Sequence, residues 1–183
     1  MLDDRQKKFV GYLLSLAAEG QEDLGALADL RSGLGKAPGE MVRVHRHVVP
    51  FLPEHERFDR LYYLIATLFG LYPMHSWSEE SQSNGRGRRE KWTIGRAFGV
   101  IKNKSDSIGA RFIALLNAHV EDLGDHLRHV ISLLKANDIP IDWFQLFDDV
   151  LKWDEPEKPV QLKWARHFYM NDAETDMNEA SQN

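Results

Sequence analysis

Apolar side chains recur along this chain at the spacing of an amphipathic helix, and this periodicity restricts the fold more than any other feature. Phe9, Leu13 and Leu16 share one helix face near the N-terminus, and Trp164 and Phe168 share another near the C-terminus. A half-buried strand requires alternating apolar and polar residues, and we find no convincing stretch of that kind. The sequence therefore predicts an all-α protein, a two-lobed helical bundle with about eight or nine helices.

Composition and the positions of helix-breaking residues divide the chain into four parts. Residues 1–72 are predicted to form an N-terminal helical lobe and residues 93–170 a C-terminal helical bundle. Residues 73–92, poor in apolar side chains and rich in Ser, Gly and Arg, are predicted to be a flexible basic loop or linker. Residues 171–183 carry four acids and no base, which predicts a disordered acidic tail. The expected helix N-caps include Asp23, Thr93 and Asp142.

Several functional classes are disfavoured by composition. The chain has no cysteine, which excludes disulfides, thiolate metal sites and a cysteine nucleophile. Its most apolar run, residues 61–74, is shorter than the roughly 20 residues that a bilayer requires, so it is predicted to be a buried helix. The charged N-terminus lacks an apolar signal core. We expect a soluble cytoplasmic protein with no membrane contact and no cofactor.

Positive charge is concentrated in two islands. The chain as a whole carries −5, whereas residues 81–111 carry +6 and residues 31–49 carry +3, so the remainder sums to −14. The cations of these islands are Arg31, Lys36, Arg43, Arg46, Arg86, Arg88, Arg89, Lys91, Arg96, Lys102, Lys104 and Arg111. Such segregation favours a polyanionic ligand, namely a nucleic acid held along a groove or stripe. No base-reading element is evident, so binding is expected to be sequence-independent and sensitive to salt.

Two other patterns have ordinary explanations. Residues 33–36, Gly-Leu-Gly-Lys, resemble a phosphate-binding loop but lack its first glycine, its Ser or Thr and a preceding strand, which favours a helix end followed by a basic turn. Asp122, His126 and His129 share one helix face that could hold a divalent metal. No second motif supplies further ligands, so a solvated helix face is favoured and no metal is expected. Trp92 is expected to anchor the second lobe.

The order of short segments in the chain resembles one known family. The segments are LRSG at 30–33, TIGRAF at 93–98, RFIALL at 111–116, LRHVISLL at 127–134, IDW at 141–143, LKW at 151–153 and WARHFY at 164–169. Together they resemble the CasB family, the small subunit of the type I-E CRISPR surveillance complex Cascade. The resemblance extends over about residues 5 to 170, nearly the whole predicted folded part.

The resemblance implies an all-helical, two-lobed protein without catalytic activity. It implies other Cascade subunits and the guide RNA as partners, with two copies head to tail along the inner belly of the complex. There they would support the target and displaced DNA strands of the R-loop. Basic side chains do this in the family, and the matching or neighbouring positions here are Arg31, Arg96, Lys102, Lys104 and Arg111. The remaining cations of the two islands are assigned from charge alone.

Two other functional classes stay open at this point. The stronger is a helical adaptor that binds only proteins and directs its arginines to acidic partners. The weaker is an enzyme with a metal on Asp122, His126 and His129, and it lacks any pattern of nucleophile and base. Salt-dependent binding to random single-stranded DNA distinguishes nucleic-acid binding from the adaptor, because counterion release produces a steep salt dependence for nucleic acid.

Overall fold

The protein is a bundle of α-helices. The computed structural model describes residues 1–54, 56–76 and 92–180, with side chains up to residue 170. These residues contain nine α-helices and no β-strand, which confirms the predicted all-α class. The helices are α1 Asp4–Ser15, α2 Leu24–Arg31, α3 His45–Val48, α4 Asp59–Leu71, α5 Ile94–Gly99, α6 Asp106–Leu116, α7 Leu123–Lys135, α8 Trp143–Leu151 and α9 Pro159–Ala180. None of the described helices has both the length and the apolar character needed to cross a membrane.

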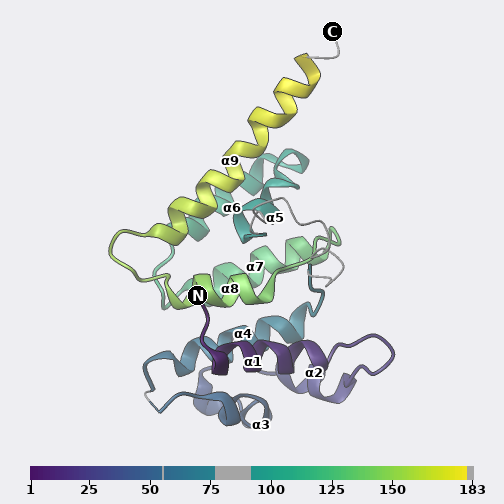
Figure 1. Cartoon of the computed structure of the whole chain (residues 1–183), viewed down its shortest axis with the longest axis vertical. Coiled ribbons are helices and arrows are strands. Elements are labelled where there is room, and N and C mark those ends of the chain that lie inside the picture. Colours follow the sequence, from purple (N-terminus) through teal and green to yellow (C-terminus); the bar gives the residue numbers. More distant parts are fainter. Residues whose placement is uncertain (55, 77–91, 181–183) are drawn as a thin grey trace.

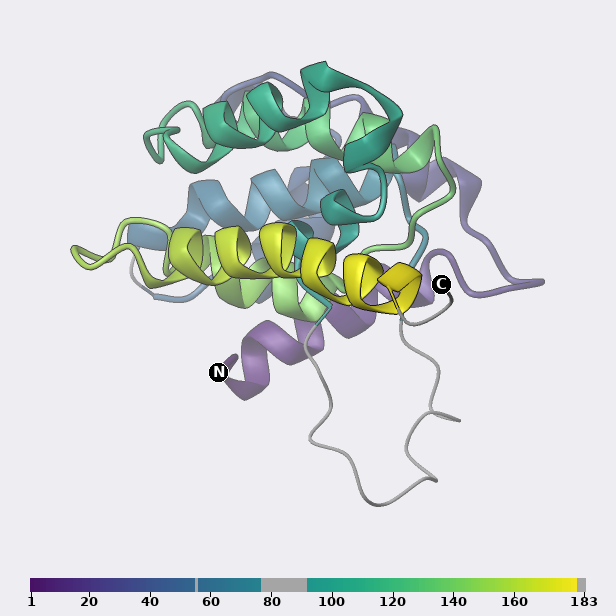
Figure 2. The same ribbon diagram turned by 90° about the horizontal axis from the view of Figure 1, so that it is seen from above.

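The helices form three groups along the long axis of the molecule, and these groups do not follow chain order. Figure 1 shows α1 to α4 at one end, α7 and α8 across the middle, and α5, α6 and α9 at the other end. Seen from above, α5 lies between α7 and α9, and it contacts both (Figure 2). The three predicted N-caps are confirmed: Asp23, Thr93 and Asp142 accept hydrogen bonds from the backbone amides three residues further on.

Helix α4 is the centre of the bundle. Its residues 61–70 are buried except for Leu64, which is half-buried. A helix that is apolar on all sides must be covered on all sides. Accordingly α2 and α3 pack on α4 from the N-terminal half of the chain, and α7 and α8 pack on it from the C-terminal half. The two predicted lobes therefore meet around one shared helix.

Aromatic rings join the two halves. Phe147 of α8 lies 4.9 Å from Tyr62 of α4 and 5.6 Å from Phe9 of α1, measured between ring centroids. Trp143 of α8 makes an edge contact with Phe69 of α4 at 5.3 Å. Such ring pairs contribute about 0.5–1.5 kcal/mol each beyond the area they bury. The described residues thus share one continuous hydrophobic core.

The ends of the predicted linker are attached to the second half. Ser76 donates its backbone N–H to Ile141 at 3.1 Å, and the Trp92 indole donates to the Pro140 carbonyl at 2.8 Å. Residues 77–91, the rest of the predicted flexible loop, lie outside the described residues. The Trp92 contact agrees with the expectation that this side chain anchors the second half.

The C-terminal helix extends further than the sequence indicated. Helix α9 continues to Ala180, through most of the segment predicted to be a disordered tail from residue 171. Its final turns project beyond the bundle (Figure 1). Residues 171–180 contain Ala, Glu and Met, which are strong helix formers, and an existing helix elongates more readily than a new one nucleates. The prediction rested on the four acids, the absence of bases and the near absence of large apolar groups, and did not weigh this propensity.

Helices α8 and α9 are joined through a buried carboxylate. Asp149 is 1 % exposed and accepts hydrogen bonds from the Trp164 indole at 2.6 Å and from Gln145 Nε2 at 2.8 Å. Lys163 of α9 completes the group as an ion pair with the same carboxylate. Because both oxygens of the Asp149 carboxylate accept hydrogen bonds, this group fixes the position of α9 along α8.

The close approach of α5 to α9 depends on the absence of a side chain at one position. A Cβ built on Gly95 lies 2.1 Å from the Trp164 carbonyl oxygen, whereas a Cβ built on Gly109 of α6 meets nothing within 4 Å. We therefore expect Gly95→Ala to lower the free energy of unfolding by about 1–3 kcal/mol through overpacking. Gly109→Ala should raise it by up to about 1 kcal/mol through helix propensity. Chemical denaturation measures both, and equal effects would contradict this packing.

A buried histidine belongs to a polar chain in the N-terminal half. His47 Nδ1 lies 2.7 Å from the Tyr12 hydroxyl, and Arg46 Nε donates to His47 Nε2 at 3.0 Å. Burial, followed by the adjacent Arg46 cation, lowers the pKa of His47 below its usual value. The folded state thus favours a neutral imidazole at this position.

The lowered pKa of His47 predicts a dependence of stability on pH. Between the folded pKa and the unfolded value near 6.5, the unfolded chain binds more protons, so stability is complete above about pH 6.5 and falls as the pH decreases. We expect His47→Asn to remove up to about 1.4 kcal/mol of the loss between pH 6.5 and 5.5. Denaturation curves at both pH values measure this. An identical pH dependence in the variant would contradict the assignment.

Candidate nucleic-acid interface

Two cations from opposite halves of the chain meet at the C-terminal end of α4. Arg31, the last residue of α2, donates from Nε to the Gly70 carbonyl at 2.9 Å. Lys135, the last residue of α7, donates from Nζ to the Leu71 carbonyl at 3.0 Å. Carbonyls at a helix C-terminus lack partners within the helix and carry partial negative charge, which makes them good acceptors for cations.

The basic island of residues 81–111 is connected to the C-terminal end of α4 through the end of α7. Lys104 lies on the 3₁₀ turn Lys102–Lys104 and donates from Nζ to Asn137 Oδ1 at 2.6 Å. Asn137 follows Lys135 by two residues. The half-buried Lys102 lies on the same turn. The two basic islands, far apart in sequence, therefore meet around the ends of α4 and α7.

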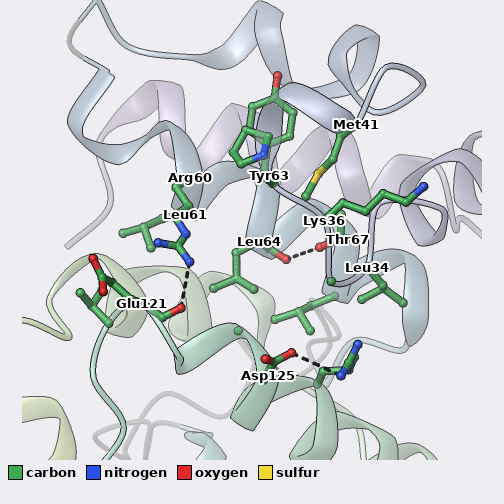
Figure 3. A pocket seen from close by; sticks show the side chains of 17 residues that line it. Leu34, Lys36, Met41, Arg60, Leu61, Tyr63, Leu64, Thr67, Glu121 and Asp125 are labelled. Atoms are coloured by element: carbon green, nitrogen blue, oxygen red, sulfur yellow. Dashed lines mark hydrogen bonds and ion pairs between the residues drawn. The ribbon is translucent and has the colours of Figure 1, made fainter.

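A second pair of cations continues the series along α7. Arg128 precedes Lys135 by seven residues, so the two share one face of the helix. Arg128 Nη1 comes within 3.1 Å of where a Cβ on Gly35 would lie, and Gly35 has a left-handed φ of +75°. The exposed Lys36 follows directly, with its ammonium group pointing outward (Figure 3). We call Arg31, Lys36, Lys104, Arg128 and Lys135 the basic track.

The charges of the track are largely uncancelled. Arg31, Lys104 and Lys135 donate to neutral oxygens, and none of the three forms an ion pair with a carboxylate among the described residues. Arg128 pairs with Asp125 at 3.3 Å in an exposed position, where water and salt screen the interaction. A neutral acceptor fixes the place of a cation without removing its charge. The track can therefore still attract an anion.

Some predicted residues lie apart from the track. Arg46 is committed to Asp29, whose Oδ2 lies 2.5 Å from Arg46 Nη2. Arg43 is exposed on the turn before α3, and no contact within the described ranges joins it to the track. Arg96 is half-buried on α5. Arg86, Arg88, Arg89 and Lys91 lie outside the described residues, so their predicted role stays a prediction.

Arg111 belongs to α6 and lies beside a face of α7 that does not carry the track. It lines a small pocket of about 200 Å³ together with His126 and His129. At 100° per residue, His129 stands roughly a third of a turn and His126 roughly half a turn from the face that carries Arg128 and Lys135. The interface thus has one connected track and a separate cation at Arg111.

Two weaker sequence patterns have structural explanations. A Cβ on Gly33 would lie 2.8 Å from Thr67 and 2.9 Å from Val44, so this glycine serves interior packing at the end of α2. Asp122, His126 and His129 do not form a metal-binding group: within the described part of the chain no three His, Asp or Glu side chains gather in that way.

Sequence reasoning missed Arg128 and Lys135. Charge was summed over windows of sequence, and both residues lie in a stretch where acids offset them. A usable signal was present, because a spacing of seven on one helix places two cations on the same face. Which basic segment that face would meet depends on tertiary packing around α4.

The chain matches a known family over most of its length. The family model described as CRISPR-associated protein Cse2 matches residues 26–169. The chain is 31 % identical over 167 residues to the CRISPR-associated protein Cse2 of Thermus thermophilus, a match that spans 89 % of each chain.

Solved structures agree with this match. The chain is 36 % identical to CasB of M. ruber, with a TM-score of 0.71 over 96 % of this chain and 98 % of that one. It shares the fold, at 22 % identity and a TM-score of 0.72, with a chain of a CRISPR RNA-guided surveillance complex, over 96 % of this chain and 97 % of the other.

Proposed function

The chain belongs to the CRISPR-associated protein Cse2 family, that of the CasB proteins, and from this premise we propose that it is the non-catalytic small subunit of a type I-E CRISPR RNA-guided surveillance complex, Cascade. Its proposed partners are the other subunits of that complex, a second copy of itself, the guide RNA, and the target and displaced DNA strands. Its proposed activity is to bind nucleic acid without sequence specificity and to stabilise the R-loop during antiviral defence.

The observation that carries this proposal is the basic track. Five cations from α2, the turn after it, the 3₁₀ turn at Lys102–Lys104 and α7 form a connected series, and three of them are held by neutral oxygens. Lys and Arg side chains that bind phosphates position a strand but do not read its bases. The arrangement therefore suits a sugar–phosphate backbone of any sequence.

The proposed mechanism is thermodynamic. Exchanging DNA–DNA pairs for RNA–DNA pairs is nearly balanced in free energy, so modest contacts between protein and backbone decide whether the open state persists. A subunit that holds the displaced strand also hinders its return to the duplex. Catalysis is not needed for either effect.

The acidic net charge is compatible with this role. The chain carries −5 overall, which is unusual for a free-standing DNA-binding protein. A subunit docked on other proteins needs only a local basic track, because its acidic faces can meet basic partners. We therefore expect the isolated chain to bind single-stranded DNA weakly.

Charge reversal on the track tests direct binding to nucleic acid. We expect Lys104→Glu with Lys135→Glu to weaken binding to random single-stranded DNA and to reduce the slope of log K against log salt by about 1.4, since each lost phosphate contact removes about 0.7. Fluorescence anisotropy over a salt series measures both quantities.

The matched control is Lys7→Glu with Lys8→Glu, an equal change of charge at exposed positions of α1. It should leave the slope near its wild-type value. Equal slopes in the two double variants would contradict the track. The absence of salt-dependent binding to DNA would favour the protein-only adaptor instead.

A second test concerns the assembled complex. Charge reversal at Lys102, Lys104 and Arg111 is expected to shorten the lifetime of the R-loop without changing the preference for target sequence, because these cations are proposed to contact only the backbone. Dissociation of a labelled displaced strand measures the lifetime. An unchanged lifetime in a complex that contains the variant subunit would refute this role.

A further inference from the structure

A pocket of about 470 Å³ lies between α4 and α7, where the two halves of the chain meet (Figure 3). Its volume falls within the range of about 300–1,000 Å³ that is usual for small-ligand sites. The inner wall is mainly apolar and includes Met41, Leu61, Leu64, Leu68 and Val120. No function described so far uses this space.

The rim of the pocket is charged: it holds three cations, two of them members of the basic track, and the two carboxylates of Glu121 and Asp125. Lys36 and Arg128, two members of the track, line it from opposite halves. Arg60 lines it as well and is held by the Glu121 carbonyl at 2.8 Å from Nη2. A phosphodiester strand that runs from Lys135 past Arg128 to Lys36 therefore passes the mouth of this pocket.

We propose that the pocket receives one unstacked nucleobase of the strand bound along the basic track. The proposal rests on the proposed function, since it requires a bound strand. A base removed from its stack exposes two flat apolar faces, which leucine side chains cover, while its phosphates stay outside on the rim cations. The site thus satisfies both parts of a nucleotide.

The pocket is expected to accept any base. The Thr67 hydroxyl donates to the Leu64 carbonyl at 3.0 Å, and the Tyr63 hydroxyl lies 2.7 Å from His45 Nδ1. These two inner polar groups are therefore already engaged. Recognition then depends on burial and not on base-specific hydrogen bonds, in agreement with a strand held irrespective of sequence.

An apolar side chain of a partner protein is the competing occupant. Such a group would fit the inner wall but would gain nothing from Lys36, Arg60 and Arg128 at the rim. A nucleotide uses the wall and the rim together. The rim cations outnumber Glu121 and Asp125 by one, and this excess of positive charge favours the nucleotide, so that the protein side chain becomes an outcome of the test.

Gly124 offers a way to fill the pocket without altering any cation. It lies on α7 and lines the pocket, and a Cβ built on it would stand 3.2 Å from Leu64 Cδ1, the flexible end of a side chain. Gly124→Met therefore directs a side chain into the space. Gly11→Met, at an exposed position of α1 where a Cβ would meet nothing within 4 Å, is the matched control away from the track.

The experiment compares two single-stranded DNA oligonucleotides with identical phosphates, one with all its bases and one with abasic sites along its central part. The wild-type chain should bind the abasic strand at least about five-fold more weakly, because a stacked or buried base contributes a factor of this order. Gly124→Met should bind both strands equally, at the affinity of the wild type for the abasic strand. Gly11→Met should behave as the wild type.

Three outcomes would overturn the proposal. Equal binding of both strands by the wild type would show that no base is buried, whether or not Gly124→Met folds. Equal weakening of both strands by a folded Gly124→Met would show that the pocket is not used by a base. Loss of assembly with the other subunits in Gly124→Met, with abasic discrimination retained, would assign the pocket to a protein side chain.

Failure of this inference is distinguishable from failure of the proposed function. If salt-dependent binding persists and only the abasic discrimination is absent, the track stands and the pocket inference falls. If salt-dependent binding is itself absent, the proposed function falls first. Thermal unfolding of both Met variants identifies any general loss of folding.

Discussion

The burial of residues 61–70 of α4 on almost every side is the constraint on which the rest of the structure depends. Residues 61–70 of this helix present apolar side chains in every direction, and no single neighbour can cover them. The chain covers α4 with helices from both of its halves, and the rings of Phe9, Tyr62 and Phe147 interlock where those halves meet. The same arrangement brings the end of α2 and the end of α7 to the C-terminus of α4. The positions of Arg31 and Lys135 thus follow from the need to bury the apolar side chains of α4.

The sequence predicted the parts that depend on local rules. Helical spacing identified the fold class, and the short polar side chains of Asp23, Thr93 and Asp142 were correctly recognised as caps, because a cap is decided within four residues. Contacts between residues far apart in the sequence could not be predicted from these rules. The pairing of Arg46 with Asp29 and the meeting of Lys135 with α4 depend on which helices become neighbours. The helical continuation of α9 was missed because the acidic charge and the near absence of large apolar groups were weighed above helix propensity.

The basic residues of this protein fall into two classes, according to whether the group that accepts their hydrogen bond is charged or neutral. Arg46 and Lys163 lie against carboxylates, so each pair is nearly neutral when seen from a distance. Arg31, Lys104 and Lys135 lie against amide and carbonyl oxygens, which have no net charge. A count of charges along the sequence treats both classes alike. We propose that the second class contributes most of the attraction expected for a polyanion.

The hydrogen bonds of Arg31, Lys104 and Lys135 also affect the entropy of association. A long cationic side chain that is free in solution loses rotamer freedom when it clamps a ligand, at a cost of about 0.5–1.5 kcal/mol. Side chains already anchored to helix-end carbonyls or to Asn137 have lost much of that freedom when the protein folds. Under the proposed function, a strand that arrives along α7 would meet a preorganised row of cations, and their ordering cost would already be met during folding.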